Sequence, residues 1–136
     1  MKLVINTSVI ISALLKKRSL AYMAIVSTKH ELYIPEYTIE EILKHMDKIR
    51  QKSELTETEI YLRILIIIYK TKIVPRNEIT KHIAKAKCII AHRDPKDVPF
   101  VATLLAIRGD GVVSYDSDYE EIIRLGYKWL KPKDII

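Results

Sequence analysis

Acidic side chains gather at points of this chain where apolar stretches give way to helical spacing. They are Glu40 and Glu41 in YTIEEILKH, Asp94 and Asp97 in DPKDVPFVA, and Asp116 and Asp118 in GVVSYDSDY. Carboxylates that are brought together repel one another, and one of them takes up a proton unless a cation compensates the charge. Hard oxygen ligands suit Mg²⁺ or Mn²⁺. The acids therefore predict a divalent-metal site if the fold places them at one edge.

Each of these acids also has a structural explanation as a helix cap. Asp94 can cap a helix with Asp97 three residues later, and Thr38 and Glu41 repeat that capping-box spacing. Asp116 can cap the helix that follows it. Taken singly, the acids fit the capping explanation better than a ligand role. Taken together they favour a site, because capping does not require these helices to start at the same edge of a sheet.

The elements that must position the acids are short apolar strands that alternate with helices. Strands are predicted over residues 2–5, 32–34, 72–74, 111–114 and 129–130. Helices are predicted over residues 7–29 (two helices hinged near 16–18), 38–50, from 56 onward, 79–91, 94–108 and 116–126. This alternation predicts a parallel sheet covered on both faces, with ligands at the carboxyl ends of its strands. We expect an α/β fold, a three-layer α/β/α sandwich with a mainly parallel sheet of about five short strands, in a single domain over residues 1–136.

The composition narrows the class of protein. The chain is 49% hydrophobic and 29% charged, which is typical of a globular domain. Its net charge of +6 favours an anionic partner such as nucleic acid, and a lysine-rich solvated surface gives the same value. Cys88 is the only cysteine, which excludes an intrachain disulfide and a zinc site built from thiolates. The chain shows no signal-peptide pattern and no long apolar run, so we expect a cytoplasmic protein without membrane contact.

Four stretches together resemble the PIN-domain nucleases, including the VapC-type toxins. They are LVINTSVIISALL, YIPEYTIEEILKH, DPKDVPFVATLLA and VVSYDSDY; the third followed by the fourth at this spacing is the most specific part. The resemblance covers nearly the whole chain and implies an endoribonuclease that uses Mg²⁺ or Mn²⁺ to cleave single-stranded RNA. It also implies the toxin of a toxin–antitoxin pair, with an antitoxin protein as partner. A homodimer is expected through the stripe Ile60, Ile64 and Ile67, unless that stripe packs inside the monomer.

The resemblance assigns the site residue by residue. The family's acids fall on Glu41, Asp97 and Asp116, with Asp118 as an auxiliary metal ligand. The first acid of the family falls on Asn6, whose amide can offer an oxygen to a metal or to its bound water but no negative charge. Three interpretations are open: a natural enzyme with weak activity, an inactive domain kept for binding, and a deliberate inactivating substitution. In all three, Asn6 and the acids are expected to share one cleft.

Further side chains are expected to assist these residues. Thr7 and Ser114 match positions at which the family has small polar residues beside its acids. Basic side chains hold nucleic acids through the phosphates, and Lys16, Arg18 and Arg93 are the candidates for RNA binding. Each of the three is also explained as an ordinary surface charge.

Other functional classes fit the residues less well. A receiver domain needs an aspartate after its third strand, where Val74, Pro75 and Arg76 stand. A dinucleotide-binding domain needs a glycine-rich first turn, and a zinc hydrolase of the common type needs an HExxH motif; the chain has neither. A non-enzymatic module that binds RNA or protein stays open because of Asn6.

Overall fold

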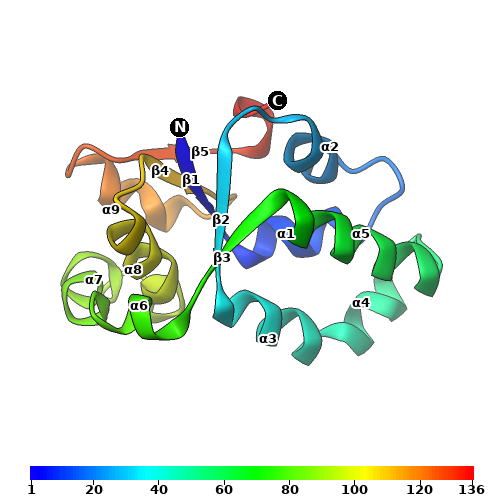
Figure 1. Ribbon diagram of the computed structural model, residues 1–136, viewed down its shortest axis with the longest axis horizontal. Helices are drawn as coiled ribbons and strands as arrows, with labels where there is room; N and C mark the ends of the chain where they lie inside the picture. Colours follow the sequence, from blue (N-terminus) through cyan, green and yellow to red (C-terminus); the bar gives the residue numbers. More distant parts are fainter.

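The computed structural model describes residues 1–136, and its centre is a parallel sheet of five short strands (Figure 1). The strands are β1 (Lys2–Ile5), β2 (Glu31–Pro35), β3 (Thr71–Val74), β4 (Gly111–Val113) and β5 (Lys128–Leu130). They lie in the order β3-β2-β1-β4-β5, and every neighbouring pair is parallel. The order changes direction between β1 and β4, which is where open α/β sheets bind their ligands.

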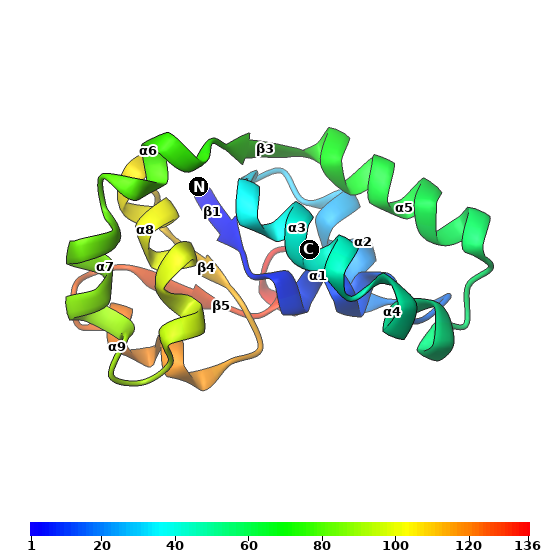
Figure 2. The same cartoon turned by 90° about the horizontal axis from the view of Figure 1, so that it is seen from below.

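Helices cover both faces of this sheet, so the predicted α/β/α sandwich is confirmed. The α-helices are α1 (Thr7–Ala13), α2 (Leu20–Ser27), α3 (Glu36–Lys44), α4 (Met46–Lys52), α5 (Glu57–Lys70), α6 (Arg76–Thr80), α7 (Ile83–Ile90), α8 (Val98–Ile107) and α9 (Glu120–Ile123). Three 3₁₀ turns are η1 (Pro95–Asp97), η2 (Ser117–Tyr119) and η3 (Pro132–Asp134). Figures 1 and 2 show α1–α5 on one side of β1 and α6–α9 on the other. None of these helices has the length and hydropathy that crossing a membrane requires.

The alternation of side chains along β1 divides the hydrophobic core into two parts. Leu3 and Ile5 belong to a cluster of 19 buried residues with α1–α5, whereas Val4 belongs to a cluster of 13 with α6–α9. Successive side chains of a strand point to opposite faces of its sheet. Since both faces are filled by packed side chains, a ligand can reach the strands only at their ends.

The segment predicted as one helix over residues 38–50 is two helices. α3 and α4 meet at His45, whose φ of −98° and ψ of 9° interrupt the helix. α3 also begins earlier than expected, at Glu36 directly after Pro35. Thr38 therefore lies inside the helix and is completely buried, so its predicted capping box with Glu41 is wrong.

Two other predicted helices are also shorter than expected. The segment over residues 79–91 divides into α6 and α7, which are separated at Lys81 and His82. The last helix, predicted to reach Gly126, begins as the 3₁₀ turn η2 and ends as α9 at Ile123. Gly126 still has the positive φ of 92° that favours glycine, so it forms the turn before β5.

Helix α5 begins with a capping box and packs one of its faces on the core. Thr56 accepts a hydrogen bond from the amide of Glu59, whose carboxylate accepts one from the amide of Thr56. Ile60 and Ile67 are only 1% and 2% exposed, so they pack inside the monomer and the predicted dimer face is wrong at these positions. The exposed apolar side chains of this helix are Tyr61, Leu62, Leu65, Ile66 and Tyr69. The homodimer itself stays a prediction.

One arginine joins α5 to the turn between α1 and α2, at the place predicted as a hinge. The guanidinium of Arg63 donates hydrogen bonds to the backbone oxygens of Ala13, Lys16 and Lys17 at 2.9, 2.8 and 2.7 Å. Its central carbon lies 4.2 Å from the centroid of the Tyr22 ring. The last carbonyls of a helix need partners outside it, and Arg63 supplies one for Ala13 at the end of α1 and two for the turn that follows.

Candidate functional site

A cleft of about 420 Å³ opens at the carboxyl end of β1. Its lining includes four of the residues expected in the site: Asn6, Glu41, Asp97 and Asp116. Asn6 directly follows β1, and Asp116 follows β4 after two residues. The cleft therefore lies where the strand order changes direction.

Four aspartates form a compact group on one wall of the cleft. One carboxylate oxygen each from Asp94, Asp97, Asp116 and Asp118 lies within 4.8 Å of the other three. Asp94 and Asp116 also act as the predicted caps, since they accept hydrogen bonds from the amides of Lys96 and Asp118, both at 2.9 Å. Capping and clustering thus occur together, because the caps of η1 and η2 fall at the same edge. Such a group is electrostatically unfavourable without a cation.

Asp97 is the buried member of the group, with 4% of its surface exposed. Its Oδ1 accepts a hydrogen bond from the Tyr119 hydroxyl at 3.0 Å, and its Oδ2 has no partner in the protein. Burial raises the pKa of Asp97 to about 7; the Tyr119 hydrogen bond opposes this rise, and the charges of Asp116 and Asp94 add to it. An unpartnered buried oxygen among three other carboxylates is what a hard divalent cation would satisfy.

Asn6 is connected to Asp97 through Tyr119. The side-chain oxygen of Asn6 accepts a hydrogen bond from the amide of Ser8 at 2.9 Å and caps α1. Its Nδ2 donates to the hydroxyl of Tyr119 at 2.8 Å. Burial raises the pKa of Tyr119 above its usual range, so the hydroxyl keeps its proton. Asn6 therefore lines the cleft, but its oxygen is already engaged in the helix cap.

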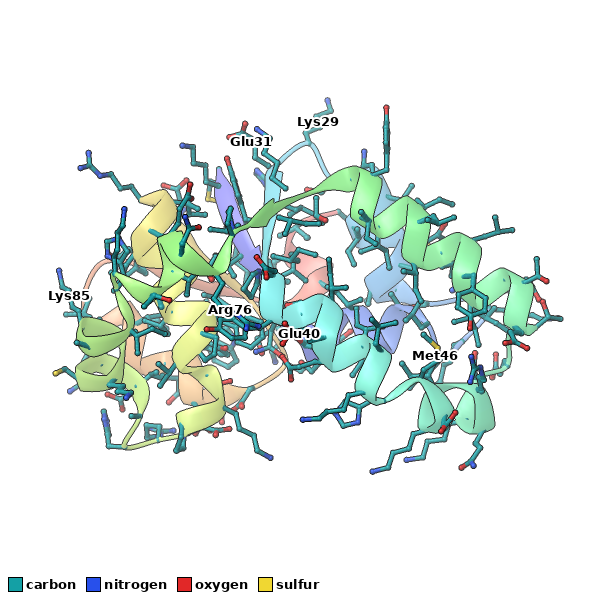
Figure 3. The ribbon with its side chains drawn as sticks, turned by 60° about the horizontal axis from the view of Figure 1, so that its bottom comes forward. Lys29, Glu31, Glu40, Met46, Arg76 and Lys85 are labelled. Carbon is teal, nitrogen blue, oxygen red and sulfur yellow. The ribbon has the colours of Figure 1, made fainter.

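Glu41 stands apart from the aspartates, on α3. One of its oxygens accepts a hydrogen bond from the hydroxyl of Thr7 at 3.0 Å, and that hydroxyl lies 3.3 Å from the hydroxyl of Thr38. Thr7 thus orients Glu41 and connects it to the first turn of α1. The neighbouring Glu40 forms an ion pair with Arg76, the first residue of α6 (Figure 3).

The remaining expected residues lie around the cleft in different roles. Ser114 is fully buried and accepts a hydrogen bond from the amide of Asp116 at 3.0 Å, so it shapes the turn after β4. Arg93 forms ion pairs with Asp118 at 3.2 Å and Glu121 at 3.0 Å. These carboxylates raise the pKa of Arg93, chiefly through the hydrogen bond to Asp118. Arg93 therefore balances the outer edge of the aspartate group.

The basic side chains that line the cleft differ from those expected for RNA binding. Lys16 and Arg18 are exposed in the turn after α1 and do not contribute to the lining, whereas Lys96 and His45 do. Lys96 lies between two aspartates of one motif, so its place in the cleft could have been predicted from the sequence. His45 lies one helical turn after Glu41 and so faces the same cleft, a spacing that could have indicated it. Tyr119 was also missed, although it follows Asp116 by three residues.

Comparisons with known proteins agree with this architecture. A family model described as the PIN domain matches residues 4–110, which include Asn6, Glu41 and Asp97. Among solved structures, VapBC2 from Rickettsia felis, determined with a DNA fragment from its promoter, is similar in fold with a TM-score of 0.67. That match covers 96% of this chain and 98% of the other at 12% identity. No curated protein sequence matches this chain. The resemblance noted in the sequence is thus confirmed, and the chain belongs to the PIN-domain family.

Proposed function

We propose that this protein is an endoribonuclease that depends on Mg²⁺ or Mn²⁺ and cleaves single-stranded RNA. The observation that carries the proposal is the group of four aspartates in which the buried Asp97 keeps an unpartnered oxygen. A cation site made of carboxylates matches the preference of these two metals for hard oxygen ligands. The net charge of +6 fits a polyanionic substrate.

Each wall of the cleft has its own part in this reaction. Asp94, Asp97 and Asp116 would hold the cation, and Asp118 would support it from the edge that Arg93 neutralises. A bound divalent cation supplies a Lewis acid that lowers the pKa of water and neutralises charge on the phosphodiester. Glu41 is oriented by Thr7 and keeps Oε2 free of hydrogen bonds within the protein, so this oxygen can accept a proton from the attacking water.

Substrate binding draws on the basic groups of the cleft. Lys96 and, when protonated, His45 offer donors to the phosphates of the RNA from within the lining. Neither group reads a base, so they position the strand and do not select a sequence. This assignment replaces Lys16 and Arg18, which lie outside the cleft.

A second function is favoured by the bonding of Asn6. Its oxygen accepts a hydrogen bond from the amide of Ser8 and its nitrogen donates one to the hydroxyl of Tyr119, so only one lone pair of the neutral oxygen is left for a cation. The position that carries an acid in the related nucleases thus adds no charge here. An inactive PIN domain that binds RNA or protein is the alternative to a weakened enzyme.

We also propose that the chain is the toxin of a toxin–antitoxin pair, with an antitoxin protein as its partner. The support is the fold similarity to VapBC2 over 96% of this chain. Induced expression of the chain alone should arrest bacterial growth, and Asp97→Asn should relieve the arrest. Growth arrest of equal strength from both chains would contradict this role.

The enzymatic proposal is tested by RNA cleavage with purified protein. Fluorescent single-stranded RNA is incubated with Mn²⁺, Mg²⁺ or excess chelator, and the products are separated by electrophoresis. We expect slow cleavage that requires metal and falls at least about a hundredfold in Asp97→Asn, a loss of about 2.7 kcal/mol in transition-state stabilisation. Asp110→Asn is the matched control, because Asp110 accepts a hydrogen bond from the amide of Lys2 at the opposite end of the strands.

The outcome separates the two functions. Cleavage that survives Asp97→Asn or chelation would come from a contaminating ribonuclease or from another site, and it would overturn the enzymatic proposal. RNA binding without cleavage in either metal would leave the binding module as the function.

A further inference from the structure

Three buried groups from distant parts of the chain form one directed hydrogen-bond chain. It runs from Nδ2 of Asn6 to the hydroxyl of Tyr119 at 2.8 Å, and from that hydroxyl to Oδ1 of Asp97 at 3.0 Å. The first bond joins residues 113 positions apart in the sequence, and the second joins residues 22 apart. Tyr119 is completely buried, so water cannot substitute for either partner.

The direction of this chain is set by the helix cap. The amide of Ser8 needs an acceptor, which obliges Asn6 to turn its oxygen toward α1 and its NH₂ group toward Tyr119. The phenol has a single proton, and its oxygen is already accepting from Asn6. The proton is therefore directed to Asp97.

A carboxylate at position 6 could not donate a hydrogen bond to Tyr119 and would itself compete for the phenol proton. Two carboxylates would then face one phenol, and the single proton could serve only one of them. The other would be left as a buried acceptor without a donor, which is destabilising, and more so for a charged group. Asparagine has nearly the same shape as aspartate, and its NH₂ group can donate to Tyr119. It is therefore the side chain that fits this position.

The hydrogen-bond chain also determines which carboxylate oxygen of Asp97 is left without a hydrogen-bond partner. Because Tyr119 occupies Oδ1, Oδ2 is the oxygen left without a hydrogen-bond partner, on a carboxylate that belongs to the group of four aspartates. We propose that Asn6 and Tyr119 are a matched positioning pair, in which the amide directs the phenol onto Oδ1 of Asp97 and so presents Oδ2 to a divalent cation. This inference rests on the proposed metal site, and it assigns Tyr119 as a positioning residue that touches neither the cation nor the RNA.

The proposed pair predicts what happens when Asn6 is replaced by the acid that the related nucleases carry at this position. Restoring an acid there adds a ligand charge but takes the phenol away from Asp97, so the two effects oppose each other. Removing the phenol hydroxyl first abolishes that competition. Asn6→Asp should therefore help cation binding much more in a chain that also carries Tyr119→Phe.

A double-mutant cycle on Mn²⁺ affinity tests the pair. The present chain, Asn6→Asp, Tyr119→Phe and the double variant are titrated with Mn²⁺ by calorimetry, and their melting temperatures are recorded in chelator to show that each folds. We expect Tyr119→Phe alone to weaken Mn²⁺ binding about tenfold, as loss of a group that orients a metal ligand commonly does. We expect the gain from Asn6→Asp to be about tenfold larger in the Tyr119→Phe background than in the present chain.

The control is Tyr127→Phe. Tyr127 packs against the same core cluster as Tyr119 but forms no side-chain hydrogen bond, so its hydroxyl should be without effect on Mn²⁺ affinity. Equal effects of Asn6→Asp in both backgrounds, or unchanged affinity in Tyr119→Phe, would overturn the pair while leaving the metal site intact. Absence of Mn²⁺ binding in all four proteins would overturn the metal-dependent function and the pair together.

Discussion

The two acidic parts of the cleft hold their carboxylates in opposite ways. The short turns η1 and η2 bring four aspartates within 4.8 Å of one another, and one of these acids is buried. Helix α3 presents Glu41 singly, with the hydroxyl of Thr7 as its partner. The aspartate group concentrates negative charge that Arg93 balances only at its outer edge, whereas Glu41 is a single acid that Thr7 orients. The comparison indicates that cation affinity belongs to the aspartate group and that Glu41 serves the chemistry.

The largest expected effect is a pH dependence that comes from Asp97 alone. Its carboxyl has a pKa of about 7 in the folded chain, whereas the ordinary pKa of an aspartate is 3.8. Between these two values the folded state holds a proton that the unfolded state has released, so the free energy of unfolding falls as the pH rises from about 4 to about 7. The difference between these two pKa values sets an upper bound of about 4 kcal/mol on this loss.

Urea denaturation in chelator at several pH values measures this dependence. Asp97→Asn cannot titrate at this position, so its stability should lose this part of the pH dependence while the other carboxylates contribute as before. Curves of unfolding free energy against pH that run parallel for the two chains would show that Asp97 ionises normally.

The second effect separates the aspartate group from Glu41 directly. Asp116→Asn should weaken Mn²⁺ binding about a hundredfold, or about 2.7 kcal/mol, because it removes a charge from the group. Glu41→Gln should change Mn²⁺ affinity by less than about threefold and still slow RNA cleavage about tenfold, which is roughly 1.4 kcal/mol of barrier. Calorimetry and the cleavage assay report the two quantities separately. Equal losses of Mn²⁺ affinity in both variants would place Glu41 among the ligands.

A smaller effect is expected from the hydroxyl that orients Glu41. Thr7→Val keeps the shape of the side chain but removes the donor, so it should cost about 1 kcal/mol of stability. Cleavage should fall while Mn²⁺ affinity stays constant, because Thr7 contacts Glu41 and none of the aspartates. Thr103→Val is the matched control, since the hydroxyl of Thr103 donates to the backbone oxygen of Pro99 inside α8. A drop in Mn²⁺ affinity in Thr7→Val would show that the two parts of the cleft are coupled.

The smallest effect concerns the basic lining. Lys96→Ala should weaken RNA binding a fewfold and reduce the slope of log affinity against log salt concentration by about 1, as expected for one lost phosphate contact. Lys16→Ala, in the turn outside the cleft, should change neither quantity. Fluorescence anisotropy at several salt concentrations measures both quantities. An equal change of slope in both variants would show that RNA also contacts the turn after α1.

The sequence allowed the sheet and the acidic motifs to be predicted, because both depend on local patterns. Short apolar strands that alternate with helices have few ways to fold, and the four aspartates of the motifs lie at or near the starts of η1 and η2, where the sequence showed capping patterns. The stripe of Ile60 and Ile67 showed a buried face, but periodicity does not say whether the monomer or a second copy covers it. The structure settles this for the two residues through their burial.

The parts of the site that escaped prediction depend on tertiary contacts. Tyr119 looks like an ordinary core residue in the sequence, and only the fold brings its hydroxyl between Asn6 and Asp97. The break at His45 has no glycine or proline to announce it, so the helical pattern continues through it. The capping box expected for Thr38 failed because Pro35 starts the helix earlier and sends that hydroxyl toward Thr7.

The contact of Arg63 has a consequence for the local dynamics of the first helix. α1 is held at its first turn by Asn6, and Arg63 donates one hydrogen bond to its last residue, Ala13, and two to the turn that follows. A short helix ordinarily frays from its ends on a fast timescale, with little free energy of local opening. With both ends tied, we expect amide hydrogens in α1 to exchange slowly and as one unit. Motion of the turn after α1 would then require α5 to move with it, so a partner that binds the outer face of α5 would be sensed at the first strand.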